Sequence, residues 1–528
     1  MPAEADDAIA IDGETLTPAD VEAVARHGAR VRVPESARAA VRESRGRIED
    51  ILETGEAVYG VNTGFGELVG ERIPAADIET LQYNLIRSHA AGTGDALESE
   101  VVRAMLVTRL NALVKGYSGI RETVIDLLVA MVNEGVHPVV YEKGSLGASG
   151  DLAPLAHLAL VTIGEGAAEV DGETMPGEEA LERAGLEPVE LRAKEGLALI
   201  NGTQLTVAQG ALVVRDAERA AMAADVAGAL TTEVTMSTTA SSHPRINDVR
   251  PHPGHDRTAR NIRMLTAASE IVESHRNCDR VQDAYSLRCL PQVHGAARDA
   301  ITHLREVVET ELNSATDNPL IFDAAEVDDR ASGTDDVAVL SGGNFHGEPL
   351  ALPLDYATSA VAELASIAER RVDRLLNPNI QEDHLPAFLT KDGGLESGYM
   401  IAQYTAADLV SSNRSLGRPS MDNVPVSGNQ EDHVSMSAQS AQLAREAVDN
   451  SLYVIATELV CATQALDFVD EDLEPGNGTK AAASLVREHV PHLAADRPVN
   501  EDVSAVKGLI RSDSLFARVE AAVGEEFE

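Results

Sequence analysis

Lysine is almost absent from this chain of 528 residues: only six of its 43 basic residues are lysines. The chain also carries 86 aspartates and glutamates, which gives a formal net charge of -43. Dense like charge destabilises a compact protein unless dissolved ions screen it. The composition therefore resembles that of proteins from the salt-saturated cytoplasm of halophiles, and an ordinary acidic enzyme is the alternative. The lysines are Lys115, Lys143, Lys194, Lys391, Lys480 and Lys507.

Four further absences limit the classes of function. The chain has no basic footprint for nucleic acid, and its negative charge repels an anionic membrane surface. It has no apolar run of about 18 residues or more, and its acidic first seven residues lack the pattern of a signal peptide. Its cysteines, Cys278, Cys289 and Cys461, are too few for a disulfide framework. These features predict a cytoplasmic protein that binds neither nucleic acid nor membranes.

The hydrophobic pattern predicts a mostly helical protein. Long stretches rich in Ala, Leu, Val, Glu and Arg cover 205–241, 347–376 and 434–466. Few segments alternate with a period of two, so a large sheet is not expected. Loop-rich sequence gives way to these long stretches near residue 215, which predicts two domains, 1–215 and 216–528.

Local signals predict smaller elements as well. Over 8–55 we expect a strand, a helix that begins at Pro18 after an N-cap at Thr17, a second strand and a second helix. The acidic insert 323–336 is expected to be a solvated loop.

The most specific pattern is the glycine-rich stretch 144–157, which reads Gly-Ser-Leu-Gly-Ala-Ser-Gly-Asp-Leu-Ala-Pro-Leu-Ala-His. Its small residues 147–150 permit backbone turns that are closed to bulkier residues. One interpretation is a tight turn before a helix N-capped by Asp151. A serine nucleophile elbow, GxSxG, fails because Asp151 stands where the last glycine belongs.

Backbone cyclisation is the third interpretation of this stretch. The amide nitrogen of Gly150 attacks the carbonyl carbon of Ala148, and only glycine leaves that nitrogen unhindered enough for a five-membered ring. Dehydration of Ser149 then leaves an exocyclic methylidene. The product is an electrophile that no ordinary side chain supplies.

This stretch resembles the signature of the aromatic amino-acid ammonia-lyases, which build 4-methylideneimidazole-5-one (MIO) from Ala-Ser-Gly. Leu146 departs from the Val most common there. Other blocks resemble the family in the same order and cover nearly the whole chain. They are Tyr59–Gly66, Ser88–Gly92, Lys194–Gln204, Gln282–Cys289, Thr316–Leu320, Gly343–Pro349 and Asn429–Met436. Several are ordinary turn sequences when taken singly, but together they predict an active site.

The resemblance implies the role of each site residue. MIO would form autocatalytically from Ala148, Ser149 and Gly150, and Tyr59 would be the general base that removes the β-proton. Arg288 would bind the substrate carboxylate with its planar fork. The residues expected to orient the substrate amine and MIO are Asn201, Gln282 and Tyr285, with Phe345 packed beside MIO.

The choice of substrate rests on polar side chains at two positions. Phenylalanine-specific relatives place an apolar residue where Ser88-His89 stands and lack an acid that matches Glu431, the neighbour of Gln430. Because a phenyl ring would leave His89 and Glu431 without partners, the expected substrate is L-histidine, and the products are trans-urocanate and ammonia. A tyrosine or phenylalanine ammonia-lyase, an aminomutase and an inactive helical scaffold are the alternatives.

The resemblance also implies an architecture and an assembly. We expect an N-terminal domain that carries MIO, followed by a long helical bundle like the core of fumarase-type lyases. Relatives are homotetramers whose active sites draw on three subunits. No catalytic metal is expected: the pairs His346 with Glu348, His433 with Glu431 and His252 with His255 lie in Pro- and Gly-rich segments, and no HExxH occurs.

The charge leads to a prediction that folding or assembly requires molar salt. At 1 M ionic strength the Debye length falls to about 3 Å, so the repulsion among surface carboxylates is screened. Dialysis into dilute buffer should cause dissociation or loss of activity. Sedimentation measures the dissociation, and a turnover assay measures the activity. An unchanged sedimentation profile and unchanged turnover in dilute buffer would contradict the prediction.

Overall fold

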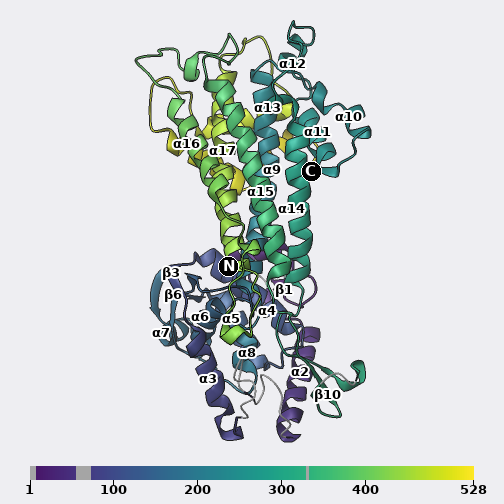
Figure 1. Ribbon diagram of the computed structural model, residues 1–528. Helices are drawn as coiled ribbons and strands as arrows, with labels where there is room; N and C mark the ends of the chain where they lie inside the picture. The colour runs from purple at the N-terminus through teal and green to yellow at the C-terminus, as the bar shows by residue number, and fades with distance from the viewer. Residues whose placement is uncertain (1–7, 55–62, 64–72, 329–331, 528) are drawn as a thin grey trace. The chain divides into compact units, whose positions relative to one another are not determined.

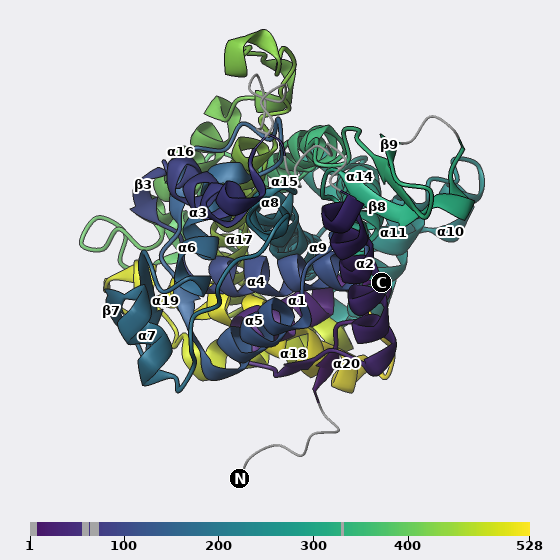
Figure 2. The ribbon, with the colours of Figure 1, turned by 90° about the horizontal axis from the view of Figure 1, so that it is seen from below.

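The computed structural model describes residues 8–54, 63, 73–328 and 332–527 (Figures 1 and 2). Contacts within the chain define two compact units. Unit 1 consists of Met1–Leu212, Leu304–Asp355 and Arg418–Gln442. Unit 2 consists of Val213–His303, Tyr356–Gly417 and Leu443–Glu528.

The units are therefore interleaved in sequence. The first segment of unit 1 ends close to the boundary expected near residue 215, but two later segments return to unit 1. The division into domains 1–215 and 216–528 remains a proposal. Four helices run from one unit into the other along the chain: α9 (Gln204–Val234), α14 (Leu290–Leu312), α15 (Glu348–Leu376) and α17 (Ser437–Leu466).

Unit 1 contains helices from the first part of the chain and short strands from that part and from the segment Leu304–Asp355. Its remaining helices are α1 (Pro18–His27), α2 (Glu35–Thr54), α3 (Ile78–His89), α4 (Ser99–Val114), α5 (Glu122–Glu134), α6 (Leu152–Thr162), α7 (Gly177–Arg183) and α8 (Glu195–Ile200). Its strands are β1 (Ile9–Ala10), β2 (Val31–Arg32), β3 (Thr93–Ala96), β4 (His137–Pro138), β5 (Tyr141–Lys143), β6 (Ala167–Val170), β7 (Glu173–Pro176), β8 (Leu320–Asp323), β9 (Ser332–Gly333) and β10 (Val337–Leu340).

The N-terminal elements follow the local sequence signals. The Thr17 side chain accepts a hydrogen bond from the Asp20 amide, and the Asp20 side chain accepts one from the Thr17 amide. This reciprocal capping box satisfies amides that the first turn of a helix leaves without partners. The predicted order of strand, helix, strand and helix over 8–55 is confirmed by β1, α1, β2 and α2.

Helix α4 is the core element of unit 1 and is buried along nearly its whole length. It packs against α1 and α5, as Figure 2 shows. The consequence is that Arg109 and Asn111 of this helix, both fully buried, must find hydrogen-bond partners inside the unit.

The sheets of the described residues have only two or three strands each. The absence of a large sheet agrees with the sequence prediction. In one sheet β10 pairs antiparallel with both β8 and β9. The acidic insert 323–336 is largely exposed or half-buried, as expected, but it also contributes β9 to this sheet. It is therefore partly ordered by strand pairing rather than being a loop throughout.

Unit 2 consists of helices and the loops between them, and none of the named strands lies in its described residues. In addition to its parts of the four long helices, it contains α10 (Pro244–Asp248), α11 (Pro253–Leu265), α12 (Glu270–Ser274), α13 (Tyr285–Arg288), α16 (Met400–Ser415), α18 (Asn477–His489), α19 (Val499–Arg511) and α20 (Ser514–Val523). The long helices α9, α15 and α17 confirm the three predicted stretches. None of the helices in the described parts of the chain has the length and apolar character needed to cross a bilayer.

A buried ion pair and a buried histidine–aspartate contact join the long helices of unit 2, which lie side by side in Figure 1. Arg371 of α15 makes a bidentate contact with Glu458 of α17, at 2.6 and 2.8 Å, and neither side chain is exposed. His294 of α14 lies 2.7 Å from Asp225 of α9, and both are fully buried. Such pairs fix which helix faces meet, because separating either one would strand a charge in the interior.

Candidate active site

The glycine-rich stretch forms a tight turn between β5 and α6. Gly147 and Gly150 have φ values of +68° and +72°, a region that favours glycine. A Cβ atom on Gly150 would lie 2.2 Å from the carbonyl oxygen of Gly202. The neighbouring amide of Asp151 donates a hydrogen bond of 2.7 Å to that same oxygen. The turn is therefore pressed against the segment that follows α8, and only glycine fits at position 150.

Asp151 occupies the N-cap position of α6, as expected, but its side chain does not cap that helix. It instead accepts hydrogen bonds from Ser145 Oγ at 2.7 Å and from the amide of Thr206 at 2.8 Å. Burial raises the pKa of the Asp151 carboxyl, and these donors oppose the rise. The side chain thus ties the start of the turn to the first residues of α9.

The structure brings Ser149 together with two other predicted site residues. The carbonyl oxygen of Ser149 accepts a hydrogen bond of 2.8 Å from Asn201 Nδ2. The Ser149 hydroxyl donates to Glu431 Oε1 at 3.2 Å across 282 positions of sequence. The Asn201 Oδ1 atom is buried and has no hydrogen-bond partner. One side chain thus polarises the Ser149 carbonyl while another faces the Ser149 hydroxyl.

The loop that carries Glu431 is attached directly to the glycine turn. The amide of Met436 donates to the Leu146 carbonyl at 2.8 Å, and Ser435 Oγ donates to the Gly147 carbonyl at 3.1 Å. Ala148, Val434 and Met436 form a small apolar cluster beside these bonds. The position of Glu431 is therefore coupled to the conformation of residues 146–148.

His89 ends helix α3 in the same unit. Its Nδ1 atom lies 2.8 Å from the carbonyl oxygen of Leu85, so that nitrogen carries a hydrogen. The loop after it is held by His157 of α6, whose Nε2 accepts a hydrogen bond of 3.0 Å from the Gly92 amide. Burial lowers the pKa of His157, which favours the neutral ring that this acceptor role requires.

The other predicted residues of unit 1 do not hydrogen-bond to the tripeptide 148–150 within the described part of the chain. Phe345 is half-buried, and Gln430 is exposed. Beside them the rings of His346 and His433 stack, with centroids 5.8 Å apart and planes 3° from parallel. Tyr59 lies outside the described residues.

Gln282, Tyr285 and Arg288 lie in unit 2. Gln282 and Arg288 line a cavity of about 380 Å³. The Arg288 guanidinium carbon lies 4.5 Å from the centre of the Tyr285 ring, and Arg288 Nε is buried with no hydrogen-bond partner. Tyr285 is 71% exposed. The guanidinium thus has donor capacity that nothing in unit 2 consumes, which suits an anionic group.

A model of the aromatic amino acid lyase family matches residues 16–488. The chain belongs to the aromatic amino acid lyase family. A curated relative named "Probable histidine ammonia-lyase", from Halobacterium salinarum, is 64% identical over 504 residues, which is 96% of each chain. The source of that relative is consistent with the halophilic origin that the composition of this chain predicts.

Solved structures agree with this family assignment. Histidine ammonia-lyase from Trypanosoma cruzi is 41% identical and superposes with a TM-score of 0.88, covering 97% of this chain and 95% of that one. Tyrosine aminomutase from Streptomyces globisporus is 37% identical with a TM-score of 0.91, covering 99% and 100%. The fold is therefore common to lyases and aminomutases, and it does not by itself separate their reactions.

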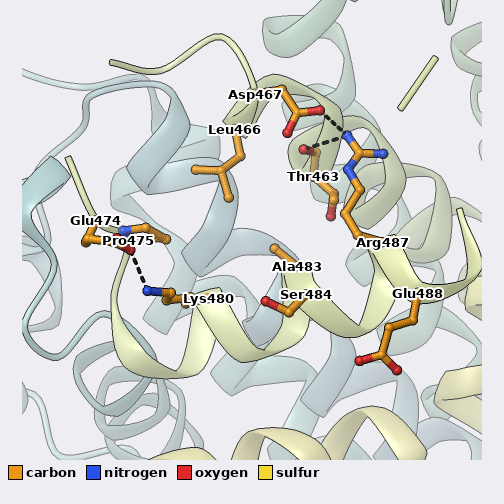
Figure 3. A pocket seen from close by; sticks show the side chains of 10 residues that line it. All are labelled: Thr463, Leu466, Asp467, Glu474, Pro475, Lys480, Ala483, Ser484, Arg487 and Glu488. Carbon is orange, nitrogen blue, oxygen red and sulfur yellow. Dashed lines mark hydrogen bonds and ion pairs between the residues drawn. The ribbon is translucent and has the colours of Figure 1, made fainter. Parts of the chain in front are cut away.

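A second, larger cavity of this family member lies elsewhere in unit 2 (Figure 3). It measures about 500 Å³ and is lined by none of the predicted site residues. Four of its charged groups pair with one another, Lys480 with Glu474 and Arg487 with Asp467, each at 2.6 Å, and Glu488 pairs with Arg518. In the described parts of the chain, no three His, Cys, Asp or Glu side chains gather as metal ligands would.

Sequence reasoning missed the residues that hold the predicted site residues in place without contacting the tripeptide 148–150. Arg109 contacts the backbone of Asn201, and Thr206 contacts Asp151. One signal was available for Arg109, because it is the single charged residue in the stretch 104–114. A charged residue in such a position is buried and needs partners.

The packing around Gly147 generates a prediction for the variant Gly147→Ala. A Cβ atom there would lie 2.2 Å from Ser435 Oγ and 2.4 Å from Ser437 Oγ. The free energy of unfolding of the variant should fall by about 1–2 kcal/mol because alanine must adopt a left-handed backbone. It should fall by about 1–3 kcal/mol more because of the clash. Urea unfolding and amide hydrogen exchange over 434–437 measure both effects.

Gly172→Ala is the matched control for this variant. Gly172 has a similar φ of +79°, but a Cβ atom there meets nothing within 4 Å. The free energy of unfolding of Gly172→Ala should therefore fall only by the amount that the left-handed backbone costs. Amide hydrogen exchange over 434–437 should stay unchanged. Equal losses of stability in the two variants would mean that the contact with Ser435 and Ser437 contributes nothing.

Proposed function

We propose that this chain is an ammonia-lyase that converts L-histidine to trans-urocanate and ammonia, the first step of histidine degradation. The observation that carries the proposal is the contact between Glu431 and Ser149. It puts a carboxylate beside the tripeptide that the family signature marks as reactive, where a substrate imidazole would find a hydrogen-bond acceptor. The identity of 64% with a relative named as a histidine ammonia-lyase supports the same substrate.

We further propose that Ala148, Ser149 and Gly150 form MIO. The residues present fit this group, because Gly150 has no room for a side chain and its turn has the required positive φ. Asn201 Nδ2 would hold the carbonyl oxygen of residue 149 after ring formation, as it holds that of Ser149. When formed, the group supplies the electrophile that makes elimination of ammonia from an α-amino acid feasible.

The ring of the substrate would be recognised by polar groups of unit 1. His89 and Glu431 would hydrogen-bond the imidazole, with Gln430 beside them and Phe345 packing at the MIO. His89 is suited to this role because its Nδ1 is already engaged by Leu85, which leaves Nε2 for a ligand. A phenyl ring would leave these groups unsatisfied, at about 1–3 kcal/mol each.

Separate residues would hold the amino acid end of the substrate. We assign the carboxylate to Arg288, whose Nε lacks a partner, and the orientation of the amine to Gln282 and Tyr285. Tyr59 would take the β-proton. A phenol is a weak base at neutral pH, so the site must stabilise its anion for this step.

We propose a homotetramer with shared active sites. Tyr285 is 71% exposed in the single chain, and Val281 is 94% exposed. Helices α15 and α16 also expose Tyr356, Ile401 and Tyr404, which are 55%, 57% and 63% exposed. Large apolar side chains with this exposure are typical of a subunit interface. All three cysteines are free, which suits the reducing cytoplasm in which we place the reaction.

The first functional prediction concerns the mass of the protein. Ring closure and dehydration each release one water, so the purified chain should weigh two waters less than its translated sequence. Ser149→Ala cannot form the methylidene and should lose nearly all activity while keeping its fold. An unmodified mass in fully active protein would refute the MIO proposal.

The second functional prediction concerns the choice between histidine and phenylalanine. Both substrates share the carboxylate, the amine and the β-carbon, so discrimination must act on the ring. Glu431→Gln should stay folded and lose about 30-fold or more in kcat/KM for histidine, equivalent to about 2 kcal/mol. His89→Leu should narrow the gap between the two substrates. The measurement is kcat/KM for both substrates, with analysis of the products for β-histidine, which an aminomutase would form.

A ratio between histidine and phenylalanine that stays constant in both variants would show that neither residue sets specificity. If Glu431 were only a structural acid, Glu431→Gln would instead lower the melting temperature and leave the ratio unchanged.

A further inference from the structure

Arg109 is the largest fully buried side chain of α4, and it does not face a carboxylate at hydrogen-bond distance. Its Nη1 donates to the carbonyl oxygen of Asn201 at 2.9 Å and to Gln204 Oε1 at 2.6 Å. Its Nη2 donates to the carbonyl oxygen of Ala198. All three acceptors belong to the segment that ends α8 and begins α9. The guanidinium therefore hydrogen-bonds to a single short stretch of chain, 198–204.

The charge of Arg109 suits this location. The carbonyl groups at the end of a helix carry partial negative charge and lack partners within the helix. Burial lowers the pKa of Arg109 to about 10, and the nearby Asp317 opposes that shift. The guanidinium is therefore still positive at neutral pH. Asp317 itself is paired with Lys194 at 2.7 Å.

The stretch that Arg109 grips is the one that contacts the reactive tripeptide. Asn201 donates from its side chain to the Ser149 carbonyl, and Gly202 accepts from the Asp151 amide through its carbonyl. A Cβ atom on Gly202 would lie 2.7 Å from Arg109 Nη1 and 2.4 Å from Gln204 Oε1. Arg109 thus fills the space on one side of Gly202 while the turn 150–151 fills the other.

We propose that Arg109 is a positioning residue that sets Asn201 and Gly202 against the tripeptide 148–150, so that both ring formation and turnover depend on it. This inference rests on the proposed function of the tripeptide. Arg109 acts only through Asn201 and Gly202, because its donors face the carbonyl side of that stretch. A shift of the Asn201 side chain would withdraw the hydrogen bond to the Ser149 carbonyl.

The direct test is Arg109→Lys, which keeps the charge but cannot serve three acceptors with a planar fork. We expect a lower fraction of chains that have lost two waters. In the chains that have cyclised we expect kcat to fall about 10- to 100-fold, as for a small misplacement of a catalytic group. KM should change less than about three-fold, because Arg109 does not touch the substrate.

Arg45→Lys is the matched control. Arg45 is also buried in unit 1 and also donates to backbone carbonyls, those of Gly119 and Ala193, at 3.2 and 3.0 Å. Its hydrogen-bond partners in the described part of the chain are Glu49, Gly119 and Ala193, all outside 198–204. The control variant therefore loses a buried guanidinium without moving Asn201. It should lower the melting temperature and leave the cyclised fraction and kcat unchanged.

A double-mutant cycle separates positioning from a general loss of stability. In the background of Asn201→Ala, Arg109→Lys should lower kcat by a smaller factor than in the wild type, because one of the two residues through which it acts has lost its side chain. If Arg109→Lys does not fold, Gln204→Met takes its place in the cycle. It removes one acceptor from the same Nη1 atom and should give a smaller effect with the same dependence on Asn201.

The outcomes distinguish this proposal from the function on which it rests. If the wild-type chain has not lost two waters, the proposed function fails. If the wild type is cyclised but Arg109→Lys behaves like Arg45→Lys, or if its effect is undiminished in the Asn201→Ala background, the positioning role is overturned.

Discussion

The contact between two backbone segments at Gly150 and Gly202 is the constraint on which the candidate site depends. The carbonyl of Gly202 accepts from the Asp151 amide at 2.7 Å, and neither glycine has room for a Cβ atom. Because the segments meet backbone to backbone, Asn201 reaches the Ser149 carbonyl with its short side chain. Buried polar groups at this contact need hydrogen-bond partners inside the protein.

The interior of unit 1 meets that requirement with neutral donors and with separate ion pairs. Asp151 is surrounded by hydroxyl and amide donors, whereas Lys194 and Asp317 neutralise each other. Glu311 is also buried, and its pKa is raised by burial and then by the charge of Asp151. Lys194 and Asp317 are thus matched, whereas Asp151 and Glu311 have neutral donors as partners, in a chain that carries -43 as a whole. Excess negative charge is confined to surfaces, where dissolved ions can screen it.

The sequence predicted those features that depend on local chemistry or on the family signature. The capping box at Thr17, the long helices and the lack of a large sheet follow from short-range patterns, and the structure confirms them. The sequence alone could not predict which loops would meet, because the contact of Ser149 with Glu431 spans 282 positions. For the same reason the hydrogen-bond partners of Arg109 could not be predicted, because they depend on how α4 packs. The side chain of Asp151 illustrates the limit, since an N-cap position was predicted correctly but its hydrogen bonds go elsewhere.

The late return of the chain to unit 1 has a consequence for protein synthesis. Unit 1 is complete only when Arg418–Gln442 has been made, long after the tripeptide has left the ribosome. At about 5–20 residues per second, the 282 positions between Ser149 and Glu431 take roughly 15 to 60 s to translate. During that interval the turn lacks Glu431, Ser435 and Met436, which fix it in the finished protein. A nascent chain therefore carries the Ala-Ser-Gly tripeptide without the contacts that fix its turn, and it gains them only near the end of translation, when the fold is nearly complete.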